Sequence, residues 1–135
     1  MSEPTTFDPN VYLSRRYEDP PCWQLVADVY ATERGQNVTE YRTVTSSIRS
    51  IASAFRVALH KGAHGFGQIA EPQDMCVVLL GERPSLGLHH CGIYWQGSVL
   101  HAVRGVGVLY QDMASLRDGY RLMEFWARPA PEVVA

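Results

Sequence analysis

The sequence predicts an α+β fold in which N-terminal helices pack on a small antiparallel sheet. In the first half of the chain, apolar residues recur at helical spacing over residues 22–33 and 46–59. From about residue 66 onward, apolar residues come instead in short runs separated by turn residues, which is typical of strands. Helices followed by a series of strands indicate an α+β architecture with the helices on one face of the sheet.

The first helix is expected over residues 22–33. Pro20 and Pro21 precede it, and proline can begin a helix although it does not continue one from upstream. Gly35 provides a C-cap at the other end. A second, amphipathic helix is expected over residues 46–59, because its apolar residues recur every three or four positions.

The second half of the chain predicts a sheet. We expect strands over residues 75–80, 89–95, 98–103, 106–110 and 120–126. Asp112 is expected to cap a short helix over residues 113–117, before the last of these strands. Because consecutive strands joined by short turns usually pair with one another, the sheet is expected to be an antiparallel meander.

The chain has 135 residues, which is enough for one domain with a sizeable core. We therefore expect a single domain over residues 1–135, in which segments 1–16 and 129–135 are extended or flexible, apart from a short turn around residues 11–13. The chain contains three cysteines, and an odd number excludes a complete set of disulfides. Reduced thiols are expected.

Charge and hydropathy exclude several classes of partner. The formal net charge is −2 and the pI is near 6.2, which gives no electrostatic case for binding nucleic acid or an anionic membrane. No apolar run approaches the ~20 residues that a membrane span needs. The first residues are polar and lack the basic and apolar regions of a signal peptide. We expect no nucleic-acid partner, no membrane insertion and no signal peptide.

Cys22 lies at the predicted start of the first helix. Free backbone N–H groups and the helix dipole favour negative charge at this position. A thiol there ionises more easily, and the thiolate is the nucleophilic form of cysteine. The alternative is that Cys22 is a small buried hydrophobe, as most lone cysteines are. This stretch alone does not decide between the two.

A predicted hairpin turn places two histidines on one face of the sheet. If Gln96 and Gly97 form a two-residue turn, Gly92 lies opposite His101. Residues two apart in a strand share a face, so His90 lies on the same face as Gly92 and His101. His90 and His101 are then diagonal neighbours, about 7 Å apart at the backbone. Their rings are expected to interact.

These three residues provide the side chains of a cysteine hydrolase. Cys22 would be the nucleophile, His90 the base that takes its proton, and His101 the group that orients His90. Backbone N–H groups at the helix start would form an oxyanion hole. The spacing alone does not establish that the helix docks on the face that carries His90. A zinc site is the alternative, with ligands from Cys22, Cys76, Cys91 and the five histidines, but the chain has no CxxC, HExxH or paired Cys/His spacing.

Several segments resemble the NlpC-type family of papain-like cell-wall cysteine peptidases, and in particular its short members in bacteriophage tails. The likeness is carried by Cys22-Trp23-Gln24-Leu25-Val26 at the helix start, His90-Cys91-Gly92-Ile93-Tyr94 in the histidine strand, and Leu100-His101-Ala102. Residues 105–108, 115–117 and 125–128 resemble the phage tail branch. The similarity covers residues 17–128. Pro21 and Gln24 depart from the family pattern, which has an acidic or amide residue and a glycine at these positions.

The resemblance implies a papain-like fold and the hydrolysis of an amide bond in peptidoglycan stem peptides. The bond is typically the one between D-glutamate and a diamino acid. Cys22 would be the nucleophile, His90 the general base and then the general acid, and His101 the orienting residue. The resemblance implies no metal and no organic cofactor.

The resemblance also suggests further site residues. The family places a tyrosine upstream of the cysteine, near the oxyanion, and this residue would be Tyr17 or Tyr12, with Tyr17 preferred. Trp23, next to the nucleophile, is a further candidate for contact with the oxyanion or the substrate.

The partners that the resemblance implies are peptidoglycan stem peptides and phage tail hub or tip proteins. The expected location is the virion tail, where the peptidase would open the cell wall during genome entry without needing a signal peptide. Two alternatives stay open. One is a structural component of the tail tip or baseplate that keeps the peptidase fold with little or no activity. The other is a different papain-like hydrolase or acyltransferase of the bacterial cytosol.

Overall fold

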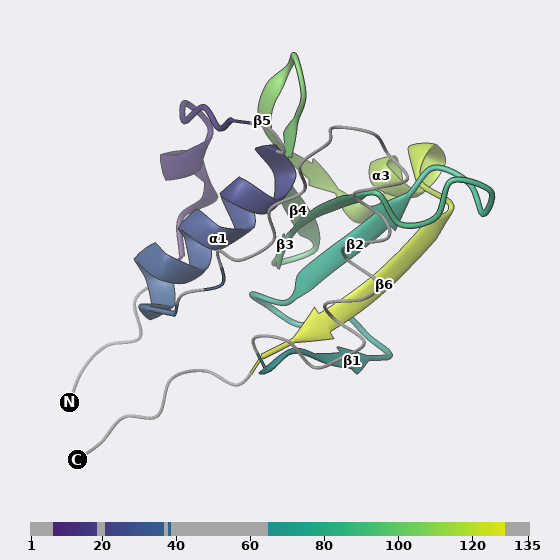
Figure 1. Ribbon diagram of the computed structural model, residues 1–135, viewed down its shortest axis with the longest axis horizontal. Coiled ribbons are helices and arrows are strands. Elements are labelled where there is room, and N and C mark those ends of the chain that lie inside the picture. The colour runs from purple at the N-terminus through teal and green to yellow at the C-terminus, as the bar shows by residue number, and fades with distance from the viewer. Residues whose placement is uncertain (1–6, 19–20, 37, 39–64, 129–135) are drawn as a thin grey trace.

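The chain folds as an N-terminal helix packed on a six-stranded antiparallel sheet, as the α+β prediction requires. This is seen in a computed structural model, which describes residues 7–18, 21–36, 38 and 65–128 (Figure 1). The helix predicted over residues 46–59 and the tail 129–135 lie outside the described residues. In the described ranges, no helix has the length and apolar character needed to cross a bilayer.

The elements of secondary structure follow the predicted order. They are η1 (Pro9–Tyr12), α1 (Pro21–Arg34), β1 (Gly67–Ile69), β2 (Val77–Gly81), β3 (His90–Trp95), β4 (Ser98–Val103), β5 (Gly107–Asp112), α3 (Met113–Gly119) and β6 (Leu122–Ala127). Among these, β1 was not predicted, because no apolar run marks this three-residue strand.

The caps of the two helices are those that the sequence predicts. Gly35 has a positive φ of 63° at the end of α1, and its N–H donates to the carbonyl oxygen of Ala31. At the start of α3, the Asp112 carboxylate accepts a hydrogen bond from the backbone N–H of Ser115. Backbone groups at the end of α1 and at the start of α3 therefore have hydrogen-bond partners.

The segment before α1 is packed on the domain. The turn expected around residues 11–13 corresponds to η1, and the Asp8 side chain caps it. Phe7 is almost completely buried and Tyr12 completely so. Described residues 7–16 are therefore anchored by aromatic side chains, although the sequence predicted an extended or flexible segment here.

The sheet has the strand order β1-β6-β2-β3-β4-β5. Strands β2 to β5 form the predicted meander, but the prediction is wrong for the last strand. β6 returns across the sheet and pairs with β2, not with β5. Every residue of β2 is buried, so the backbone groups on both edges of this strand need hydrogen-bonding partners. β3 pairs with one edge, and β6 pairs with the other.

The β3–β4 hairpin has the predicted register. Tyr94 lies opposite Val99 and Ile93 opposite Leu100. Gln96 and Gly97 both have positive φ, at 47° and 87°, which is the conformation of the two-residue turn that matches strand twist. This turn determines which side chains of the two strands share a face.

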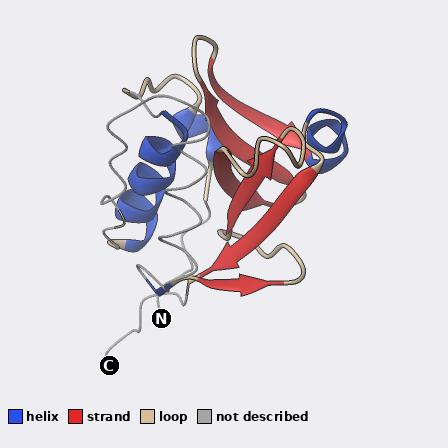
Figure 2. Ribbon diagram, turned by 45° about the vertical axis from the view of Figure 1, so that its right-hand side comes forward, coloured by secondary structure: helices blue, strands red, loops and turns tan. Residues whose placement is uncertain are grey.

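The two faces of the sheet are covered by different helices (Figure 2). One core cluster joins α1 to the face that carries Cys91, Ile93 and Leu100. The other contains Val99 and Leu116, and so lies between the sheet and α3. Because side chains alternate along a strand, His90 and His101 belong to the second face. α1 therefore docks on the face opposite to the one that carries His90 and His101, a point that the spacing of the sequence had left open.

Candidate active site

Cys22 reaches His90 even though α1 covers the other face. Cys22 is the second residue of α1, and His90 is the first residue of β3. Both lie at the end of their element, and their side chains interact there. A contact between two element termini does not require the helix to lie over the face that carries the histidine. Cys22 and His90 therefore meet at the rim of the sheet.

The thiol of Cys22 is activated by its neighbours. A hydrogen bond with Cys91 is the largest cause that lowers the pKa of Cys22, and the hydrogen bond and charge of His90 lower it further. Burial acts in the opposite direction, but the net result is a pKa well below the ordinary thiol value. Cys22 therefore ionises more readily than an ordinary cysteine, and the thiolate is its nucleophilic form.

The other two cysteines differ from Cys22. Burial, and then the interaction with Cys22, raise the pKa of Cys91 well above its ordinary value, so Cys91 keeps its proton. Burial raises the pKa of Cys76 to about 11. Cys91 is therefore a hydrogen-bond donor to Cys22, a role that the sequence analysis missed. The sequence could have indicated this role, because Cys91 directly follows His90 and its side chain points to the opposite face of the strand, which α1 covers.

The two histidines are in direct contact. Nε2 of His90 lies 2.8 Å from Nδ1 of His101, and their ring centroids are 5.0 Å apart. The other ring nitrogen of His101, Nε2, lies 2.6 Å from Oε1 of Gln111. His101 is 1% exposed, so water does not compete for these contacts. Three side chains from β3, β4 and β5 thus form one hydrogen-bonded chain.

The direction of the protons in this chain follows from Gln111. Burial, together with the charge of His90, lowers the pKa of His101 to about 4, so its neutral ring holds one proton. The carbonyl oxygen of Gln111 can only accept, which assigns that proton to Nε2 of His101. Nδ1 of His101 then accepts from Nε2–H of His90. Nδ1 of His90 remains as the nitrogen that can take the proton of Cys22.

Tyr120 completes the surroundings of His90. Its ring stacks on the imidazole with centroids 5.6 Å apart and an interplanar angle of 16°. His89 also lies near Tyr120, but its Nε2 accepts a hydrogen bond from the backbone N–H of Glu82. Of the two adjacent histidines, His90 is therefore the one joined to His101 and Cys22. Stacking restricts the rotation of the His90 ring.

Gln111 and Tyr120 are site residues that the sequence analysis missed. Gln111 lies two residues after Leu109, which pairs with His101, so the register of the β4–β5 hairpin would have placed it on the histidine face. No comparable signal exists for Tyr120. Its position depends on the return of β6 to the far edge of β2.

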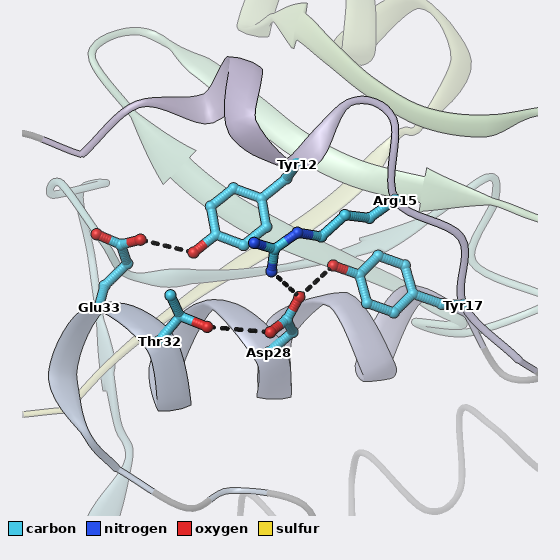
Figure 3. Close-up of polar contacts among 6 residues, drawn as sticks. All are labelled: Tyr12, Arg15, Tyr17, Asp28, Thr32 and Glu33. Atoms are coloured by element: carbon cyan, nitrogen blue, oxygen red, sulfur yellow. Dashed lines mark hydrogen bonds and ion pairs between the residues drawn. The ribbon is translucent and has the colours of Figure 1, made fainter.

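The predicted oxyanion tyrosines are held by carboxylates (Figure 3). The Tyr17 hydroxyl donates to Oδ2 of Asp28 at 2.5 Å, and the Arg15 guanidinium contacts the same oxygen at 2.7 Å. The Tyr12 hydroxyl donates to Glu33 at 2.6 Å. Both hydroxyls therefore contact carboxylates farther along α1 than Cys22.

Trp23 follows Cys22 but its side chain belongs to the core. It is 1% exposed, and its Nε1–H donates to the carbonyl oxygen of Val38 at 2.8 Å. A substrate next to Cys22 would meet the backbone of Trp23 rather than its indole ring. The hydrogen bond also ties the first turn of α1 to the chain beyond the helix, which holds Cys22 in place.

A cleft of about 200 Å³ lies beside the start of α1. Its walls include Pro21 and Ala102, which are the chain neighbours of Cys22 and His101. The side chains of Cys22, His90 and His101 do not line it. The cleft is therefore a neighbouring space from which a ligand could extend to the thiol.

The arrangement combines a thiol of lowered pKa with an oriented imidazole, which is the combination that nucleophilic catalysis by cysteine uses. In the described part of the chain, no three His, Cys, Asp or Glu side chains are grouped as metal ligands.

Comparisons of the chain with protein-family models, curated proteins and solved structures found no match.

Proposed function

We propose that this protein is a papain-like, NlpC-type cysteine peptidase that hydrolyses amide bonds in peptidoglycan stem peptides. The observation that carries the proposal is the chain of contacts from Cys22 through His90 and His101 to Gln111. It supplies a nucleophile, a base with a defined free nitrogen, and two groups that orient the base. The sequence likeness to this family supports the choice of substrate.

The proposed first step is acylation. The Cys22 thiolate attacks the carbonyl carbon of the scissile amide, and a C–S bond forms as the carbonyl oxygen becomes an oxyanion. Backbone N–H groups at the start of α1, which lack partners within the helix, would stabilise this charge. The proton that His90 took from the thiol passes to the amine nitrogen as the C–N bond breaks. A thioester and a free amine result.

The second step is deacylation. His90, now neutral, takes a proton from water, and the resulting hydroxide attacks the thioester carbonyl. The C–S bond breaks and the carboxylic acid leaves. Cys22 is again a thiolate, and His90 again carries the additional proton. Throughout both steps, His101 accepts from Nε2–H of His90 and keeps Nδ1 of His90 directed at the reacting atoms.

A place in a bacteriophage tail is part of the proposal. It is supported by the likeness of residues 105–108, 115–117 and 125–128 to the tail-associated branch of the family. The peptidase would then cut the cell wall locally during genome entry, in contact with tail hub or tip proteins.

The test is a digest of purified peptidoglycan by the wild type, Cys22→Ala and Cys76→Ala, with the products identified by mass spectrometry. Cys76 is a matched control, because it is a buried thiol whose raised pKa keeps it protonated. The proposal expects cleaved stem peptides from the wild type and Cys76→Ala, and none from Cys22→Ala. Intact stem peptides in all three digests, with all three proteins folded, would refute the proposed peptidase activity. Copurification with tail hub proteins would then favour the structural alternative.

A further inference from the structure

The cleft beside α1 has a strongly basic lining. Three arginines contribute to it, namely Arg15, Arg16 and Arg104, and none of the described residues that line it is acidic. The whole chain carries a formal net charge of −2, so this concentration of positive charge is local. A concave surface lined by charge of one sign attracts ligands of the opposite sign.

The three arginines are not equivalent. Arg15 is engaged by the Asp28 carboxylate at 2.7 Å and lies 4.6 Å above the ring of Tyr12, so it forms a fixed part of the wall (Figure 3). Arg16 is exposed and has no ionic partner within the described ranges. Arg104 is exposed in the turn between β4 and β5. Arg16 and Arg104 are therefore the side chains that a ligand in the cleft would meet.

The position of the cleft connects it to the catalytic residues. One wall comes from the segment before α1 and ends at Pro21, directly before Cys22. The other wall comprises the end of β4, from Ala102 directly after His101, and the β4–β5 turn. Val106 at this turn is 63% exposed and adds an apolar contact surface. A peptide bound in the cleft would thus lead toward the thiol.

We propose that the cleft is a subsite for a carboxylate of the peptide substrate, next to the bond that is cut. This inference rests on the proposed function for the identity of the ligand as a peptide. Guanidinium groups bind carboxylates through paired, charge-assisted hydrogen bonds, and two arginines on opposite walls can enclose one such group. The enzyme would then select stem peptides in which the carboxylate beside the scissile amide is free rather than amidated.

Binding tests this inference separately from catalysis. Cys22→Ala protein is titrated by NMR with two synthetic stem peptides that differ only in a free carboxylate or a carboxamide at this position. We expect the carboxylate form to bind about ten-fold more tightly, since a charge-assisted hydrogen bond adds roughly 1.5 kcal/mol or more. Adding Arg16→Gln or Arg104→Gln to this protein should remove the difference. Arg117→Gln, an exposed arginine in α3, is the matched control and should retain it.

Two results would overturn the subsite. One is equal affinity for both peptides, and the other is an unchanged preference after both Arg16→Gln and Arg104→Gln, with thermal unfolding showing that the variants are folded. The outcome of the peptidoglycan digest is independent of these results. If the wild type fails to cut but Cys22→Ala prefers the carboxylate peptide, the proposed reaction fails and the subsite stands.

Discussion

Nε2 of His90 lies 2.8 Å from Nδ1 of His101, and this contact determines which nitrogen of His90 is free to act as the base in the proposed reaction. If His101 accepts, His90 must carry its proton on Nε2 and presents a lone pair on Nδ1. If the protons were reversed, Nδ1 of His90 would carry hydrogen and would not accept the thiol proton. The proposed activity therefore depends on Gln111, because its carbonyl oxygen accepts from His101 and determines which nitrogen of His101 carries the proton.

Replacing Gln111 tests this dependence. Gln111→Leu removes the acceptor for Nε2–H of His101, and we expect kcat to fall by about ten-fold or more, as when groups that orient catalytic ligands are lost. Gln111→Glu keeps an acceptor and should restore much of kcat near neutral pH. Its negative charge should also raise the pKa of His101 from about 4.

The pH profile distinguishes orientation from packing. Once His101 is protonated on both nitrogens, it no longer accepts from His90. The acid limb of kcat/KM should therefore lie at higher pH in Gln111→Glu than in the wild type. A purely structural role for Gln111 would lower the activity of both variants without moving this limb, and that outcome would contradict the assignment of the His101 proton to Nε2.

The ionisation of Cys22 can be followed by the ultraviolet absorbance of the thiolate. Because Cys91 and His90 lower the pKa of Cys22, the thiolate signal should persist below the ordinary thiol value of ~8.5. His90→Ala removes one of these causes and should move the titration to higher pH. Cys22→Ser serves as the control and should lack the signal at neutral pH, since the pKa values of the other two cysteines are raised. A wild-type titration at or above ~8.5 would mean that the thiol is not activated.

The parts of the site that sequence predicts are those set by local structure. A two-residue turn determines the register of β3 and β4, so the contact between His90 and His101 follows from Gln96 and Gly97. The helix start at Pro21 likewise follows from its own residues. Each of these inferences needs only neighbouring parts of the chain.

The parts that sequence does not predict depend on long-range packing. The face that α1 covers is decided by its apolar fit to Ile93 and Leu100, which no local signal specifies. The stacking of Tyr120 on His90 requires β6 to return to the edge of β2. Cys22 and His90 come together although α1 covers the face opposite to that of His90, because they meet at the ends of their elements.

Tyr120 is a positioning residue for His90. Tyr120→Phe keeps the stacked ring, and we expect little change in kcat. Tyr120→Ala removes it, and the loss of a ring pair worth about 1 kcal/mol should free the imidazole to rotate and lower kcat several-fold with a smaller effect on KM. Equal kcat values for the alanine and phenylalanine variants, both folded by circular dichroism, would exclude this role.

Asp28 stabilises the fold by holding the segment before α1 on the helix. Its carboxylate oxygen Oδ2 accepts hydrogen bonds from Tyr17 and Arg15. Its other oxygen, Oδ1, accepts a hydrogen bond from the Thr32 hydroxyl at 3.1 Å (Figure 3). Burial raises the pKa of Asp28, but these hydrogen bonds outweigh it and lower the pKa below its ordinary value. Asp28→Asn should lower the free energy of unfolding by about 1 kcal/mol at neutral pH, measured by urea denaturation.

The stabilisation by Asp28 should depend on pH, because its pKa is lowered in the folded state. A carboxylate whose pKa is lower in the folded state stabilises the fold above its unfolded pKa of ~3.9, and this contribution is lost as the pH falls through the folded pKa. The difference between wild type and Asp28→Asn should therefore be largest near neutral pH and shrink in acid. Asp118→Asn, an exposed aspartate in α3, should show a smaller difference at neutral pH. If the Asp28→Asn difference were the same at both pH values, the charge of Asp28 would contribute nothing, and its packing alone would anchor residues 15–17.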